Sequence, residues 1–191
     1  MKWGTLSEVE FRHAAAVVLD EIGHAIGSAS YEDVNRLFCE IQSARRVFLA
    51  GAGRSRQMLG AFAMRLMHIG FTAHMVGDVT TPAIGAKDLL IVASGSGETS
   101  TVVVIAEKAR KAGARIALIT TSRFSTLKKI AETSVVLPVP GLEAVTSQQV
   151  GAAAFEQVVL ILGDVLIMLL AKAQGMDEAN TSLQARHANL E

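Results

Sequence analysis

The feature that most restricts the fold is a repeated change between short apolar runs and stretches with helical spacing. Five apolar runs rich in branched residues occur between residues 45 and 140, and their sequences are RVFLAG, TAHMV, DLLIVAS, RIALITT and SVVLPV. Helical stretches lie between most of them. Strands that alternate with helices form parallel sheets with both faces covered. The chain is therefore predicted to be an α/β protein, a three-layer αβα sandwich with a five-stranded parallel sheet.

Helices are expected on both sides of this core in the sequence. Two helical stretches fill residues 5–43, and a long helix is predicted from Ser147 to Gln174, before a polar tail. A length of 191 residues is enough for one domain with a large core. The prediction is a single domain over residues 1–191, with N-terminal helices at about 5–43, the sheet core at about 45–140 and the long helix with its tail at about 147–191.

Composition argues against several kinds of partner. The chain has 18 Lys and Arg residues against 18 Asp and Glu residues, so it lacks the basic surface that nucleic acid or an anionic membrane attracts. The most apolar stretch, Val158–Ala171, contains Asp164 and is shorter than the roughly 20 residues that cross a bilayer. The single cysteine, Cys39, is predicted to be a buried, inert thiol. Because no signal-peptide pattern is present either, we expect a cytoplasmic protein that binds neither nucleic acid nor membrane.

Two loops are predicted to carry the chemistry, because ligands of open parallel sheets bind beyond the carboxyl ends of the strands. The first is GAGRS, Gly51–Ser55, and the second is SGSGETS, which begins at Ser94. Glycines let the backbone approach an anion, hydroxyls donate to its oxygens, and a helix that begins near Thr99 adds free N–H groups. Ser94, Ser96 and Thr99 can each take one terminal oxygen of a phosphate monoester. The alternative is that these residues only cap the helix, for which one hydroxyl would suffice.

A dinucleotide site is a second alternative for the first loop. GAGRSR begins like the GxGxxG fingerprint, but Arg56 stands where a third, small residue belongs. Asp78 is a possible partner for a ribose hydroxyl. This interpretation leaves the second loop unexplained, and the phosphate-loop pattern GxxxxGK[ST] is absent from the chain.

The two strand–loop–helix units resemble those of the sugar isomerase (SIS) domain, through GAGRS and SGSGET. Three further segments are similar to those of the 6-phospho-3-hexuloisomerases, namely FAMRLMHIGF (62–71), VGDVTTPAI (76–84) and RHANLE (186–191). The resemblance covers nearly the whole chain. It implies a flavodoxin-like sheet, no metal or organic cofactor, and a tetramer in which each site is completed by a neighbouring subunit. The implied reaction interconverts 3-hexulose 6-phosphate and fructose 6-phosphate, downstream of formaldehyde fixation in the ribulose monophosphate pathway.

Such a reaction moves a carbonyl between C3 and C2 through an enediolate, and it requires a base and a hydrogen-bond donor. Glu156 is the candidate base, because its neighbours are apolar and disfavour the charged carboxylate. The resemblance places the family's catalytic glutamate at the same FE pair. Gln149 is predicted to share a helix face with Glu156 and to bind substrate. The alternative is that Glu156 is an exposed helix residue or a member of an ion pair.

The remaining site candidates come from the tail and from the first loop. His187, within the RHANLE segment, is the candidate donor, unless the tail is disordered. Gly53, Arg54 and Ser55 are predicted to bind substrate, with Arg54 on the phosphate or on a sugar hydroxyl. A subunit salt bridge is the alternative for Arg54. The other histidines lack the spacing of metal ligands, so no metal site is expected.

One departure from the resemblance concerns the substrate. Where 6-phospho-3-hexuloisomerases usually carry a Pro-Met-Gly-Ser/Thr-like stretch, this chain has VGAA, Val150–Ala153, which lacks the hydroxyl. Two other functions therefore stay open. One is a different aldose–ketose isomerase, such as an arabinose-5-phosphate isomerase, and the other is a non-catalytic regulator that binds sugar phosphates. We also expect Val158–Ala171 to be partly buried against another subunit, because half of the chain is hydrophobic.

Overall fold

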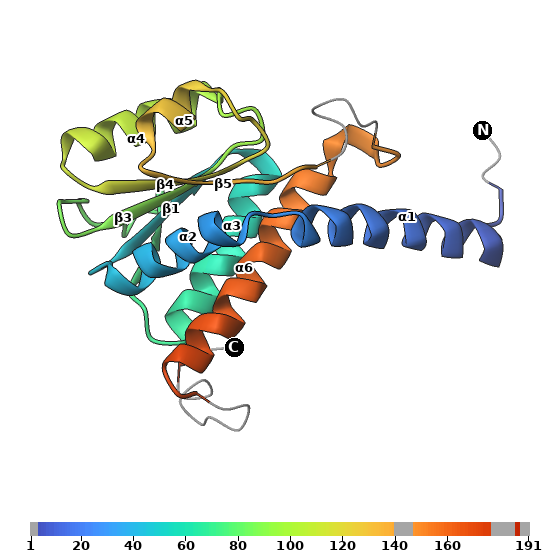
Figure 1. Ribbon diagram of the computed structural model, residues 1–191, viewed down its shortest axis with the longest axis horizontal. Helices are drawn as coiled ribbons and strands as arrows, with labels where there is room; N and C mark the ends of the chain where they lie inside the picture. Colours follow the sequence, from blue (N-terminus) through green and yellow to red (C-terminus); the bar gives the residue numbers. More distant parts are fainter. Residues whose placement is uncertain (1–3, 140–146, 177–185, 188–191) are drawn as a thin grey trace.

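A five-stranded parallel sheet lies at the centre of the molecule (Figure 1). The computed structural model describes residues 4–139, 147–176 and 186–187. The strand order is β2-β1-β3-β4-β5, which is the flavodoxin-like order. The strands are β1 (Val47–Gly51), β2 (Ala73–Met75), β3 (Leu89–Ala93), β4 (Arg115–Thr120) and β5 (Thr133–Val136). All five predicted strands are present, and the predicted sandwich is confirmed.

Helices cover both faces of this sheet, as the apolar strands require. They are α1 (Glu8–Gly27), α2 (Tyr31–Ser43), α3 (Gly53–His68), α4 (Ser100–Lys111), α5 (Thr126–Ile130), the 3₁₀ turn η1 (Val150–Ala152) and α6 (Ala154–Ala173). Side chains alternate along each strand. Leu49 therefore packs with α2, α3 and α6 on one face, whereas Phe48 packs with α4 and α5 on the other.

The register of the sheet brings the two predicted loops together. β1 pairs with β3 along its whole length, and Gly51 lies opposite Ala93 at the carboxyl end. Paired strands lie about 4.8 Å apart. The loop that follows Gly51 and the loop that follows Ala93 therefore start side by side, at the point where the strand order reverses.

The predicted helix from Ser147 to Gln174 is wrong in its first part. Gly151 has φ +69°, a conformation that glycine adopts far more readily than other residues, and α6 begins only at Ala154. Gln149 precedes this kink with an extended backbone. It therefore does not share a helix face with Glu156, contrary to the sequence prediction.

Helix α6 packs closely along α3. Gly163 makes this possible, because a Cβ atom there would lie 3.2 Å from the Phe62 ring. By length and composition α6 could also cross a membrane, since the whole helix has 20 residues and exceeds the apolar stretch on which the sequence analysis relied. A core helix meets the same criteria, and eight residues of α6 are buried against the rest of the protein.

The prediction for Cys39 is also wrong, because its thiol is exposed. Leu37 and Ile41 of the same helix, α2, are fully buried. Cys39 lies two residues from each of them and so faces away from the sheet. The apolar character of VNRLFCEI extends around the helix and did not reveal which side is buried.

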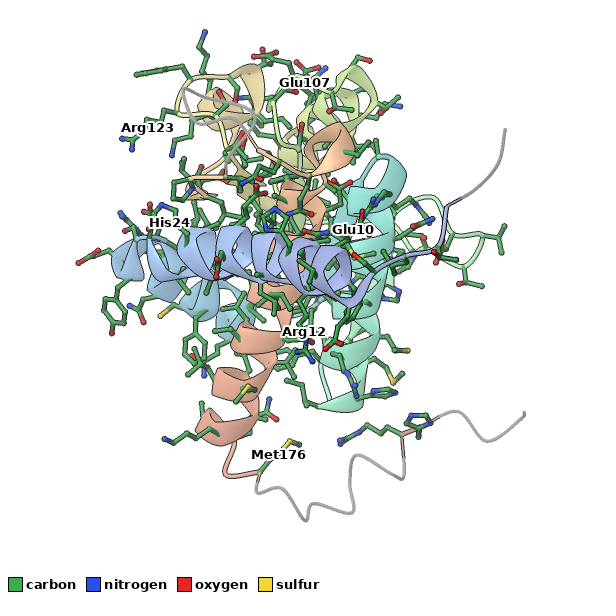
Figure 2. All side chains as sticks on the ribbon, turned by 90° about the vertical axis from the view of Figure 1, so that its right-hand side faces the viewer. Glu10, Arg12, His24, Glu107, Arg123 and Met176 are labelled. Atoms are coloured by element: carbon green, nitrogen blue, oxygen red, sulfur yellow. The ribbon has the colours of Figure 1, made fainter. Side chains whose placement is uncertain are left out.

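The first half of α1 projects away from the sheet (Figure 1). A capping box between Ser7 and Glu10 closes its N-terminus. Figure 2 looks onto this projecting helix, with Glu10 and Arg12 in its first turns and His24 near its other end. Several apolar side chains of this region are exposed, namely Leu6, Val9, Phe11 and Leu19.

Candidate active site

The second loop folds its hydroxyls toward one another. Ser94 directly follows β3 and is 3% exposed, and its Oγ lies 2.8 Å from Thr99 Oγ1. The Gly97 N–H donates to Ser94 Oγ at 3.1 Å. Gly97 has φ +67°, and a Cβ there would overlap the Ser125 side chain. This glycine therefore allows the tight turn that brings Ser94 and Thr99 together.

Residues at the end of β4 and just after it bind this loop. The hydroxyls of Thr120 and Thr121 donate to the Gly95 carbonyl, at 3.0 and 2.9 Å. Glu98 accepts a hydrogen bond from the Thr126 N–H at 2.6 Å, and hydrogen bonds from Thr126 lower the pKa of Glu98. Glu98 thus accepts the first N–H of α5, whose N-cap residue is Ser125, and does not cap the helix that follows its own loop.

The N-terminus of α4 has no side-chain cap. Thr99 is its N-cap residue, but the Thr99 side chain does not cap the helix. Ser96 is exposed, and its Oγ accepts a hydrogen bond from the Glu98 N–H at 3.2 Å. Free N–H groups in the first turn of a helix attract anions. The loop therefore has the features of a phosphate site without a lysine.

The start of α3 brings the first loop to the candidate base. Gly53 has φ +54°, and Arg54 and Ser55 follow it in the first turn of α3. Arg54 Nε lies 3.2 Å from Glu156 Oε1, which belongs to the first turn of α6. The Glu156 side chain is 14% exposed and that of Arg54 is 57% exposed. The ion pair that was an alternative for Glu156 is therefore present in the free protein.

The same loop argues against a dinucleotide site. Arg56 Nη2 donates to Asp78 Oδ1 at 2.6 Å. Arg56 replaces the small third residue of the fingerprint. Its guanidinium binds the Asp78 carboxylate, which in a dinucleotide site would bind a ribose hydroxyl. Both departures from the fingerprint thus belong to one salt bridge.

Gln149 is held by a residue that sequence analysis missed. Its Nε2 donates to Glu21 Oε2 of α1 at 3.0 Å, and the backbone N–H of Gln148 donates to Glu21 Oε1 at 2.9 Å. More than a hundred residues separate these partners in the sequence, and no motif surrounds Glu21. Only the tertiary structure could have revealed the contact.

His187 lies at the other end of α3 from Glu156. Its ring stacks on that of His68, with centroids 5.0 Å apart, and Arg186 Nη1 donates to the His68 carbonyl at 3.3 Å. At 1.5 Å per residue, His68 is about 20 Å along the helix axis from Arg54. Within one chain the structure brings Arg54 and Glu156 together, but it does not bring His187 to them.

The environment of His68 is unusual for a histidine. The residue is 2% exposed, and its Nδ1 has no hydrogen-bond partner among the described residues. Burial, together with the nearby charges of His187 and Arg65, lowers the pKa of His68. In the described part of the chain, no group of three or more His, Cys, Asp or Glu side chains could hold a metal ion.

A cavity of about 410 Å³ lies beside the end of β5. It is lined by residues from the turn between α1 and α2 and from the loop after β4, among them Ser30, Thr121 and Arg123. Figure 2 shows Arg123 at the top of the molecule and Met176, which follows α6, at the bottom. Arg123 places a positive charge in the lining of this cavity, and no sequence motif indicated this residue.

Comparison with known proteins assigns this architecture to a family. Residues 40–167 match the model of the SIS domain, and the chain belongs to this family. A Mycobacterium gastri protein named 3-hexulose-6-phosphate isomerase is 44% identical over 179 residues, which are 92% of this chain and 89% of that protein. A Bacillus subtilis protein of the same name is 37% identical and covers 92% of this chain and 96% of its own.

A solved structure agrees with these relatives. A Methanococcus jannaschii protein, whose crystal structure is described as inferring a function of 3-hexulose-6-phosphate isomerase, has a TM-score of 0.80 and 31% identity to this chain. The match covers 94% of this chain and 99% of that one. The similarity therefore includes the whole sandwich and not only the two loops.

Proposed function

We propose that the protein is a phosphosugar isomerase that interconverts 3-hexulose 6-phosphate and fructose 6-phosphate. The observation that carries the proposal is that relatives named for this isomerase match 92% of the chain at 37–44% identity. The geometry supports it, because a hydroxyl-lined loop follows β3, and the nearly buried carboxylate of Glu156 contacts Arg54 just after the neighbouring strand β1.

The second loop binds the phosphate in this proposal. Ser94, Ser96 and Thr99 donate to the terminal oxygens, and the first turn of α4 adds backbone N–H groups. Hydrogen bonds to charged groups contribute about 1.5–3 kcal/mol each. Ser94 and Thr99 then exchange their mutual hydrogen bond for bonds to the ligand. Gly53 and Ser55 line the neighbouring strand end.

Glu156 moves the proton between the carbons. Starting from the 3-hexulose, its carboxylate removes the hydrogen of C2, and the electron pair forms the C2–C3 double bond of an enediolate. Glu156 then returns the proton to C3. Meanwhile the hydroxyl oxygen of C2 loses a proton and becomes the carbonyl, and the oxygen of C3 gains one. No net oxidation occurs.

Arg54 is the counter-ion of Glu156 in the free protein. A phosphate or sugar oxygen that binds Arg54 withdraws the guanidinium from the carboxylate, and the carboxylate becomes a better base. Gln149 binds a hydroxyl of the open-chain sugar. Substrate binding and activation of the base are thereby coupled through one side chain.

His187 acts as donor in this proposal only if the site is shared between subunits. The separation of the two ends of α3 supports a homo-oligomer, and we propose a tetramer with each site completed by a neighbour. Exposed apolar residues support such an assembly, among them Phe11 and Leu19 on α1 and Met168 and Leu169 on α6. The protein would then work as a soluble cytoplasmic enzyme.

Proton exchange in heavy water tests the reaction. Incubation with fructose 6-phosphate should place deuterium at C3 of fructose 6-phosphate and at C2 of the 3-hexulose, detectable by NMR. Exchange at C1 would instead indicate an aldose–ketose isomerase. Absence of exchange at every carbon would favour a regulator that only binds sugar phosphates.

A further inference from the structure

One carboxylate of α1 organises the segment that leads into α6. Glu21 accepts hydrogen bonds from Ser147 Oγ at 2.8 Å, from the Gln148 N–H at 2.9 Å and from Gln149 Nε2 at 3.0 Å. Ser147 Oγ in turn accepts from the Gln149 N–H at 3.0 Å. Backbone and side chains of three consecutive residues thus depend on a single acceptor.

The carboxylate is held in its charged form by these bonds. Burial acts to raise the pKa of Glu21, but the hydrogen bonds from Gln148, Ser147 and Gln149 together outweigh it and lower the pKa. Among the described residues, no Lys, Arg or His lies within salt-bridge distance of Glu21. In the described part of the chain its charge is therefore met by these three hydrogen-bond donors, and such charge-assisted bonds are stronger than neutral ones.

Apart from the contact with Glu21, little in the described part of the chain restrains the position of residues 147–151. Gly151 has φ +69°, and nothing lies within 4 Å of the position of a Cβ there. Gln149 also lines an open groove of about 340 Å³ between α1 and the segment. The direction in which Gln149 points is therefore set more by Glu21 than by the packing of α6.

The contact also decides which atoms of the Gln149 amide are available. A carboxylate can only accept hydrogen bonds, so the amide must turn its NH₂ group toward Glu21. The acceptor Oε1 then remains for a hydroxyl donor. A sugar chain is rich in such hydroxyls.

We propose that Glu21 is a positioning residue of the isomerase site: it orients the Gln149 amide to accept a sugar hydroxyl and fixes the entry to α6, which carries Glu156. This inference rests on the proposed function. Glu21 itself touches neither the sugar nor the reacting carbons. Its effect reaches the reaction through Gln149 and through the start of α6.

Replacement of Glu21 by alanine tests the inference, with Asp20→Asn as a matched control. Asp20 is the exposed neighbour of Glu21 on the same helix. Loss of an outer contact that orients a metal ligand typically costs about 10–100-fold in affinity or activity, and we expect a similar factor for a contact that orients a sugar-binding amide. Glu21→Ala should lower kcat/KM by that factor. Inorganic phosphate should still inhibit the variant with the same inhibition constant as the wild type, because the second loop is intact. Turnover within about twofold of Asp20→Asn would overturn the inference.

Hydrogen exchange distinguishes positioning from a general loss of stability. Amides of residues 147–156 should exchange faster in Glu21→Ala, whereas those of β1 and β3 should keep their protection. Glu21→Gln retains the size of the side chain but has a single acceptor oxygen, so it cannot accept both from Gln148 N–H and from the donors at Oε2. This variant serves if the alanine variant does not fold. A drop in turnover with unchanged exchange at 147–156 would contradict a role through this segment.

A double-mutant cycle with Ser147→Ala provides the second readout. If Glu21 acts through the segment, Ser147→Ala should lower kcat/KM in the wild type and have almost no further effect beside Glu21→Ala. Additive effects would contradict the inference. If the wild type itself fails to convert the 3-hexulose 6-phosphate, the proposed function fails, and hydrogen exchange still shows whether Glu21 holds residues 147–156.

Discussion

The two ends of helix α3 differ in how their polar groups are satisfied. At the N-terminal end, Arg54 and Glu156 form an ion pair beside the two loops. At the C-terminal end, His68 and His187 stack with a buried ring nitrogen that has no hydrogen-bond partner among the described residues. One chain therefore brings together the proposed phosphate loop and the proposed base by itself. The histidines can serve a site only where another subunit presents its loop edge to them.

The largest effect is expected from Glu156→Gln at the N-terminal end. The amide keeps the shape of the side chain but cannot accept a proton. Because general acid–base catalysis contributes about 10²–10⁴-fold, kcat should fall by that factor, and deuterium exchange into the substrate should fall with it. Enzyme assays and NMR measure both quantities.

Asp164→Asn is the control for this variant. Asp164 is an exposed carboxylate of the same helix, and its change should leave turnover unaltered. A folded Glu156→Gln protein that exchanges at the wild-type rate would remove Glu156 from the reaction. The base would then have to come from the other end of α3 or from another residue.

The next effect concerns the loop beside the same end. Ser96→Ala combined with Thr99→Ala removes two donors from the phosphate site and should weaken sugar-phosphate binding by about 3–6 kcal/mol, at 1.5–3 kcal/mol per charge-assisted bond. Calorimetry measures the affinity. Ser100→Ala with Thr101→Ala removes two exposed hydroxyls of the following turn and should change it little. Equal losses in the two double variants would place the phosphate elsewhere.

Subunit mixing tests whether the two ends of α3 meet between chains. His187→Ala should lower turnover by less than Glu156→Gln, because a donor that polarises an oxygen contributes less than the base. When the two impaired variants are mixed and reassembled, some sites combine an intact Glu156 with an intact His187, and turnover should rise above that of either variant alone. No recovery, or a 20.2 kDa monomer in sedimentation, would contradict a shared site.

Sequence patterns predicted the regions whose structure is local. The strands, the start of α4 near Thr99 and the location of both loops at one edge of the sheet follow from periodicity and from the rule that parallel strands end at one edge. For the same reason Arg54 and Ser94 could be assigned to one edge of the sheet without any structure.

The wrong or missing predictions concern features that depend on contacts between residues far apart in the sequence. The helix that contains Glu156 begins later than predicted, because Glu21 binds residues 147–149 and Gly151 breaks the helix behind them. The location of His187 depends on Arg186 binding a carbonyl at the end of α3. Neither contact leaves a periodic signal in the sequence.

The smallest effect is a pH dependence of stability from the C-terminal end of α3. Burial lowers the pKa of His68 in the folded protein, and the charges of His187 and Arg65 lower it further, so the unfolded chain binds the proton more tightly. The stability that depends on neutral His68 is complete above the ordinary pKa of 6.5 and is lost as the pH falls from there toward the lowered pKa. His68→Gln cannot titrate, so its Tm should fall less than that of the wild type between about pH 7.5 and about pH 5.5. His13→Gln, at an exposed position of α1, should keep the wild-type dependence, and an equal fall of Tm in all three proteins would show that His68 is not buried in its neutral form.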